Sequence, residues 1–152
     1  MIEVDVLVES KNWKKIIQNP KKEIRNIVTK FPNRYKFIYR KACISVLLTN
    51  SKRIKLLNKK FRKKNKPTDI LSFPFFDKKN LRKNLKSREF YLGDIVISYN
   101  EFVKKNKNDN KNGFIKIFIH GFLHLLNFDH KSNNDYKVMN NIENKIFQKV
   151  KG

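Results

Sequence analysis

The chain has 152 residues and a mass of 18.3 kDa, which is the usual size of one domain with a continuous core. Hydrophobic residues make up 39% of it, including 13 Phe and 5 Tyr, so wholesale disorder is excluded. The formal charge of +23 favours polyanionic partners, with nucleic acid first and an anionic membrane surface second. Most of this excess is explained equally well by a composition rich in Lys, Asn, Ile and Phe, whose codons are AT-rich.

The prediction of a cellular compartment depends on features that the sequence lacks. Cys43 is the only cysteine, so an intramolecular disulfide is excluded, and its place in an apolar run predicts a core residue. The opening MIEVDVLVES carries acidic residues where a signal peptide carries basic ones. No apolar run approaches the roughly 18 to 20 residues of a membrane span, because Lys116, His120 and His124 interrupt the most hydrophobic stretch. We therefore expect a soluble cytoplasmic protein.

The first half of the chain alternates strand and helix patterns. Apolar and acidic residues alternate over residues 2–8, which predicts a half-buried strand. Apolar residues recur at near-helical spacing over residues 12–29, and Pro20 divides this segment into two helical pieces. The same reasoning predicts a strand over 42–49, a helix over 51–61 followed by the basic run 62–66, and a strand over 69–75 whose flanking prolines suit a sheet edge.

The second half is more helical. Residues 78–89 are polar and highly charged, which predicts a mobile loop, and residues 91–98 return to a strand pattern. Ser98 and Glu101 form an S-x-x-E capping box that predicts a helix start. The remaining predicted elements are a polar break over 104–112, a buried helix over 114–126 and an amphipathic helix over 135–150. This irregular alternation indicates one α+β domain over residues 1–152, with a small mixed sheet of about four strands packed with helices.

The segment HGFLHLLNFDH, residues 120–130, contains every histidine in the chain. His120 and His124 are four residues apart on a predicted helix, so their imidazoles lie about one turn apart on one face. His130 lies past the helix end and reaches them only if the chain turns sharply. Asn127 stands where that turn is needed, and Asn is the non-glycine residue that best tolerates the left-handed conformation of a C-cap. The spacing therefore predicts that the three imidazoles bind one metal ion.

Three neutral imidazoles leave a fourth position for water on a zinc-like ion, which is the arrangement of catalytic sites. Such an ion acts as a Lewis acid and lowers the pKa of bound water toward about 7. The spacing of the histidines is also that of the metzincin zinc proteases, in which a Glu general base follows the first His. Gly121 stands at that position here and cannot transfer protons, so peptide hydrolysis of that type is not expected.

Three ordered blocks resemble one family. HGFLHLLNFDH is similar to the HGxLHLxGYDH signature of the YbeY endoribonucleases, the bacterial rRNA maturation factors. FRKKNKPTDILSFPF at 61–75 and LGDIVIS at 92–98 follow the family's order and spacing, and the similarity covers roughly residues 43–150. Asn127 replaces the family's Gly, which puts slight strain on the turn, and Phe128 replaces its Tyr, which removes a hydroxyl.

The resemblance implies a single-domain α+β metalloprotein that cleaves single-stranded RNA in 16S rRNA 3′-end maturation and small-subunit quality control. It implies one Zn²⁺ per chain, held by His120, His124 and His130, with Arg62 and His120 as the catalytic residues. An arginine suits this chemistry because its planar guanidinium can clamp the charge that develops on phosphate oxygens. The alternative for Arg62 is one more solvated cation in a basic run.

Several neighbouring residues have two interpretations. Asp94 and Asp129 are candidates to accept the second N–H of a ligand histidine, or else to bond the strand end and cap the turn. Thr68 and Ser72 match the family pattern but are expected to serve turn and packing. Met139 invites comparison with the metzincin Met-turn, although its helical stripe favours the core.

Three alternative functions stay open at this point. The first is a non-catalytic, metal-stabilised assembly factor that binds rRNA, which the missing general-base Glu favours slightly. The second is a small metalloprotease, which Gly121 opposes. The third is a membrane-surface protein, for which the chain lacks a basic amphipathic helix with a clear apolar stripe. The expected partners are ribosomal RNA and components of the small subunit, with no membrane, and the oligomeric state is left open.

Overall fold

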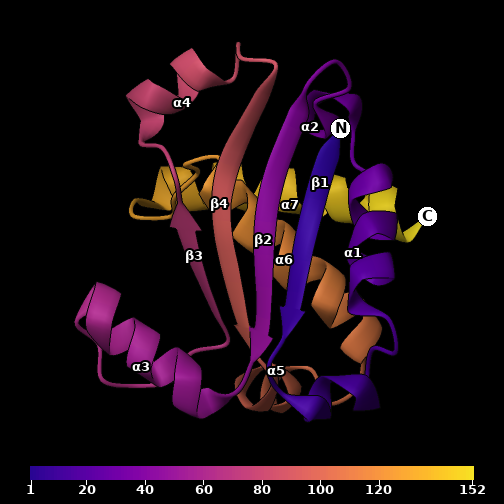
Figure 1. Ribbon diagram of the computed structural model, residues 1–152, viewed down its shortest axis with the longest axis vertical. Coiled ribbons are helices and arrows are strands. Elements are labelled where there is room, and N and C mark those ends of the chain that lie inside the picture. Colours follow the sequence, from indigo (N-terminus) through magenta and orange to yellow (C-terminus); the bar gives the residue numbers. More distant parts are fainter.

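A mixed four-stranded sheet forms the centre of the computed structural model, which describes residues 1–152 (Figure 1). Across the sheet the strands lie in the order β1 (Ile2–Val8), β2 (Lys41–Thr49), β4 (Glu89–Ser98) and β3 (Ile70–Pro74). Strands β1, β2 and β4 are parallel, and β3 pairs antiparallel with β4 at one edge. The predicted α+β class, the mixed sheet and the edge position of the third strand are therefore confirmed.

The helices cover the two faces of the sheet unequally. Helices α1 (Pro20–Thr29), α6 (Asn110–Leu125) and α7 (Asn133–Lys151) lie on one side, and α6 and α7 pass behind the strands in Figure 1. Helix α3 (Ser51–Arg62) packs on the other face beside β3 and β4, through a small cluster of Ile54, Leu71 and Val96. The remaining helices are short: a 3-10 turn over Lys11–Lys15, α2 (Asn33–Lys36), α4 (Lys78–Asn84) and α5 (Tyr99–Lys105).

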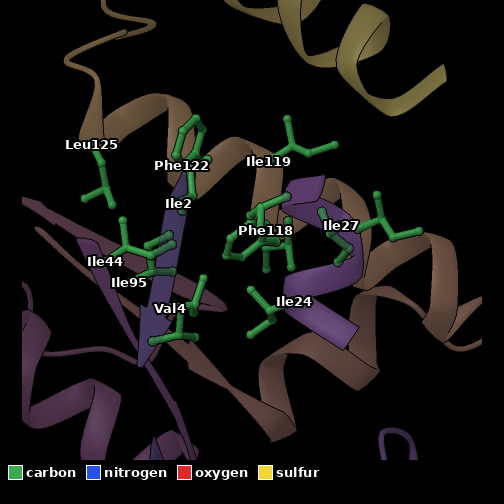
Figure 2. Packing of buried hydrophobic residues seen from close by; sticks show 14 of the residues in the cluster. Ile2, Val4, Ile24, Ile27, Ile44, Ile95, Phe118, Ile119, Phe122 and Leu125 are labelled. Carbon is green, nitrogen blue, oxygen red and sulfur yellow. The ribbon is translucent and has the colours of Figure 1, made fainter. Parts of the chain in front are cut away.

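The main core lies between the sheet and the covering helices. Figure 2 shows apolar side chains of β1, β2 and β4 meeting those of α1 and α6: Ile2, Val4, Ile44, Ile95, Ile24, Ile27, Phe118 and Phe122. Helix α6 is buried on most of its surface, as its sequence predicts, and full burial of each large apolar side chain contributes about 1.5–3 kcal/mol. Helix α6 therefore belongs to the main core. None of the helices has both the length and the apolar character that a membrane crossing requires.

Two local expectations are wrong. The segment predicted as a loop contains α4, whose N-terminus is capped by Asp77 accepting a 2.8 Å hydrogen bond from the Asn80 N–H. Only Leu81 of that helix is buried, so its hydrophobic pattern is too weak to be recognised. Cys43 is half-buried rather than a core residue, because the side chains on β2 alternate and its neighbours face the main core instead.

The predicted capping box is also only half correct. Helix α5 begins after Ser98 as expected, but the Ser98 side chain makes no capping hydrogen bond and its buried hydroxyl has no partner. The Glu101 carboxylate instead accepts a 3.3 Å hydrogen bond from the Ser51 hydroxyl at the start of α3. This contact joins two helices that begin at the same end of the sheet.

Candidate metal centre

Helix α6 fixes the first two histidines against the sheet. The Nε2 atoms of His120 and His124 lie 3.1 Å apart. Between them, the carbonyl of Gly121 accepts a 3.0 Å hydrogen bond from the Ser72 hydroxyl, and a Cβ at Gly121 would lie 2.7 Å from Cδ1 of Ile70. The position after the first histidine therefore packs against β3. A side chain there requires Ile70 to shift.

The turn after α6 has the hydrogen bonds of a Schellman motif. Asn127 adopts φ 65°, its N–H donates to the His124 carbonyl at 2.9 Å, and the Phe128 N–H donates to the Leu123 carbonyl at 3.1 Å. The Asn127 amide group also donates to the Phe76 carbonyl at 2.8 Å. Asn127 thus takes the predicted left-handed conformation and ties the turn to the segment after β3.

This turn returns the chain so that His130 joins the other two histidines. One ring nitrogen from each histidine lies within 4.8 Å of the others, with His120 and His124 half-buried and His130 exposed. Two ligands of a tetrahedral zinc ion, at bonds of about 2.0–2.1 Å, stand about 3.3 Å apart, close to the separation of the His120 and His124 nitrogens. The donor set therefore fits a small divalent ion that prefers nitrogen ligands, and the predicted convergence is confirmed.

Burial keeps His124 in its metal-binding form. Desolvation, followed by the neighbouring His120 and His130, lowers the pKa of His124 from 6.5 to about 4. His124 is therefore neutral at pH 7, with a lone pair available for a metal ion.

Glu143 on α7 orients His120. Its Oε1 lies 2.6 Å from Nδ1 of His120, and because a carboxylate only accepts, Nδ1 carries the hydrogen and Nε2 presents its lone pair to the cluster. Sequence reasoning missed this residue, which lies 23 positions along the chain. The sequence feature that could have indicated Glu143 is its position four residues after Met139, on the side of α7 that faces the core.

The two aspartates proposed for this contact do not make it. Asp129 accepts a 2.7 Å hydrogen bond from the His130 backbone N–H, which lowers the pKa of Asp129, so it caps the turn. Asp94 is exposed on β4 and accepts a 2.5 Å hydrogen bond from the Tyr91 hydroxyl. Burial, followed by this hydrogen bond, raises the pKa of Tyr91 to about 12.

Arg62 and the three histidines line one cleft of about 700 Å³. Arg62 is the last residue of α3, and its Nη2 donates a 2.9 Å hydrogen bond to the Ser72 carbonyl on β3. The cations that line the cleft are Arg62, Lys64, Lys66, Lys105 and Lys131, and its acidic residues are Asp69, Glu101 and Asp129. Each of these acids has a lysine partner within 4 Å. The cleft thus presents a positive surface beside the histidines.

Ser72 and Met139 have the packing roles expected of them, whereas Thr68 lines the cleft. Ser72 is buried and bonds α6, and Thr68 lines the cleft with its hydroxyl 3.4 Å from an Asp69 carboxylate oxygen. Met139 is buried in the main core, as its helical stripe predicts. It also lines a smaller hollow of about 220 Å³ on the α7 side of His120 and His130.

Comparison with known proteins identifies the family of the chain. Residues 7–151 match the model of the family described as endoribonuclease YbeY. The chain belongs to the YbeY endoribonuclease family. A YbeY endoribonuclease of Pelagibacter ubique (strain HTCC1062) is 49% identical, with 99% of this chain and 97% of that protein covered. One of Ehrlichia canis (strain Jake) is 34% identical, with 99% and 93% covered.

The fold has a counterpart among solved structures. The solution structure of a Thermotoga maritima protein matches with a TM-score of 0.58 and 26% identity, covering 97% of this chain and 89% of that chain. The three-histidine cluster of this YbeY family member is thus placed on a fold that a solved structure shares, and it is able to bind a metal ion.

Proposed function

We propose that the chain is a metal-dependent endoribonuclease that cleaves single-stranded RNA, with His120, His124 and His130 holding one Zn²⁺. The observation that carries the proposal is that three convergent imidazoles share a positively charged cleft with Arg62, in a member of the YbeY family. A divalent ion bound there would supply Lewis acidity and a water of lowered pKa. Three protein ligands leave a position open for that chemistry.

Arg62 is proposed as the catalytic residue that binds the phosphate. One of its N–H groups is held by the Ser72 carbonyl, which keeps the guanidinium beside β3. The other donors of this guanidinium are available to a phosphodiester in the cleft, whose charge grows on the nonbridging oxygens during cleavage. His120 is the second proposed catalytic residue, with Glu143 fixing which of its nitrogens faces the reaction.

The proposed substrate is ribosomal RNA, at the 3′ end of 16S rRNA, and the proposed partners are components of the small ribosomal subunit in the cytoplasm. Support comes from the formal charge of +23, the paired acids of the cleft and the names of the relatives. A positive cleft attracts the RNA backbone through counterion release, whatever the sequence of the RNA.

A second candidate is a non-catalytic assembly factor that binds rRNA and uses the metal to hold its structure. The observation that favours it is Gly121, because α6 carries no carboxylate at the position where related spacings place a general base.

Cleavage of an end-labelled single-stranded RNA, with and without a chelator, separates the two candidates. We expect cleavage by the wild type, its loss with chelator or in His120→Ala, and its loss in Arg62→Glu. Lys55→Glu is the matched control, because it reverses one exposed charge on the same helix outside the cleft and is expected to keep activity. RNA binding without any cleavage by the zinc-loaded wild type would favour the assembly factor.

A further inference from the structure

Two phenylalanines are exposed beside the cleft. Phe61 on α3 is 58% exposed and Phe75, just after β3, is 63% exposed. Their rings meet half-buried aromatic neighbours edge to face: Phe61 lies 5.3 Å from Phe73, and Phe75 lies 5.6 Å from Tyr91, measured between ring centroids. We call Phe61, Phe73 and Phe75 the aromatic strip. Burial in the core does not explain it, because its two outer rings remain largely in solvent.

The aromatic strip begins where the cleft ends. Along β3, Ile70 and Ser72 line the cleft, whereas Phe73 faces the opposite side of the sheet, as alternation in a strand requires. Phe61 directly precedes Arg62, whose guanidinium reaches the Ser72 carbonyl on the same strand. A flexible polymer that binds Arg62 in the cleft therefore has the aromatic strip as the next surface across β3.

The surface beside the aromatic strip is basic on the α3 side and acidic on the other, so a polyanion is favoured on the α3 side only. Lys60 places its ammonium group 5.3 Å from the centre of the Phe61 ring, within the basic end of α3. On the other side Phe73 is in register with Asp94, and Asp94 is in register with Ser45 and then Asp5, so the open sheet face becomes acidic. Phosphates are attracted along the α3 side and repelled from the rest of the sheet.

We propose that the aromatic strip binds bases of single-stranded RNA that extends from the cleft across β3. The inference rests on the proposed function, since it extends the path of the same substrate. Exposed rings next to cations suit this ligand, because bases stack on aromatic faces while lysines neutralise the backbone. A duplex is a poor ligand because its bases are already stacked on one another. The strip therefore selects unpaired RNA without reading its sequence.

Fluorescence anisotropy with a labelled single-stranded RNA that is longer than the cleft tests the proposal. We expect Phe61→Ala and Phe75→Ala each to weaken binding by about tenfold, the loss of roughly one stacked base. Phe61→Leu is expected to weaken binding similarly, because it keeps apolar surface but has no ring face, whereas Phe61→Trp retains affinity. Leu56→Ala is the matched control, since Leu56 is 57% exposed on the same helix, and it should bind as the wild type does.

An RNA of the same length without bases separates stacking from charge. The wild type and Phe61→Ala are expected to bind this base-free RNA equally. Unchanged affinity of both alanine variants for ordinary RNA would overturn the proposal, as would an equal loss on base-free RNA. A wild-type dimer that dissociates in Phe61→Ala would also overturn it, assigning the strip to a second copy of the chain. If Phe61→Ala does not fold by circular dichroism, Phe61→Leu and Phe75→Ala decide.

These measurements do not depend on cleavage. Absence of cleavage by the zinc-loaded wild type contradicts the proposed function and leaves the RNA affinities of the variants interpretable. Cleavage by the wild type together with unchanged affinities in the strip variants contradicts the present inference alone.

Discussion

Helix α6 and the turn that follows it bring histidines to the same point by different means. His120 and His124 belong to a helix that is buried on most of its surface, so their separation is set by helical geometry and core packing. His130 is exposed and belongs to a segment held by one left-handed residue and a few hydrogen bonds. Two ligands are therefore built into the fold, whereas the third depends on local backbone conformation.

The largest expected effect is on the sheet-facing side of α6. Gly121→Glu places a charged side chain where even a Cβ lies 2.7 Å from Ile70, so we expect unfolding to become easier by about 3 kcal/mol or more. Urea denaturation measures this change. Lys111→Glu, an exposed substitution on the same helix, is the control and should change stability by less than about 0.5 kcal/mol. A stable Gly121→Glu protein would show that α6 is not packed on β3 as described.

The turn should be sensitive to a smaller change. Asn127→Ala places a residue that disfavours the left-handed conformation at φ 65° and removes the side-chain amide. We expect a cost of about 1–2 kcal/mol for the conformation and about 1 kcal/mol for the lost hydrogen bond to Phe76. Asn127→Gly loses only the hydrogen bond and should cost less. Denaturation and zinc titration of both variants test this ranking. Equal stability of the alanine and glycine variants would contradict the role of the left-handed residue.

Loss of the carboxylate behind His120 should act on metal affinity more than on folding. Glu143→Ala is expected to weaken zinc binding by about 10- to 100-fold, because His120 is no longer fixed with Nε2 toward the cluster. Glu143→Gln can still accept a hydrogen bond from Nδ1 and should lose less. Asp129→Asn is the matched control, since the Asp129 carboxylate bonds the backbone N–H of His130 and lies 3.7 Å from the Lys131 ammonium group, rather than bonding an imidazole. Competition with a chromophoric chelator gives the affinities, and an equal loss in the control would refute this role.

A pH dependence is expected of the metal-free protein. Because the pKa of His124 falls from 6.5 to about 4 on folding, the unfolded chain binds a proton between these values that the folded chain does not. Stability is therefore full above pH 6.5 and decreases as the pH falls toward 4. His124→Asn should flatten this part of the urea-midpoint profile. An unchanged slope in that variant would assign the dependence to other groups.

Local patterns were sufficient for most of the fold and for the histidines. The strands and long helices follow from periods of two and 3.6 residues, and the Asn127 turn follows from the conformational freedom of Asn. Helix α4 was not predicted because a single buried residue, Leu81, gives no period. Cys43 was misplaced because a continuous apolar run hides which side chains face the core.

Contacts between distant segments could not be predicted from the sequence. Glu143 meets His120 only because α7 packs on α6, so no spacing rule favours it over Asp94 or Asp129, which are nearer to the recognised motifs. The close packing at Gly121 is likewise a tertiary contact, because it depends on Ile70 of β3. The exposure of Phe61 and Phe75 could not be predicted from composition, because phenylalanine side chains are usually buried in the core.

Elemental analysis of the purified protein tests most directly whether the three histidines bind one metal ion. Wild-type protein dialysed against buffer containing a trace of zinc is expected to retain about one zinc ion per chain, as a three-histidine site requires. His130→Ala should retain much less while its circular dichroism spectrum stays that of the wild type. Equal zinc in both proteins, or none in the wild type, would contradict the assignment of the three histidines to a single ion.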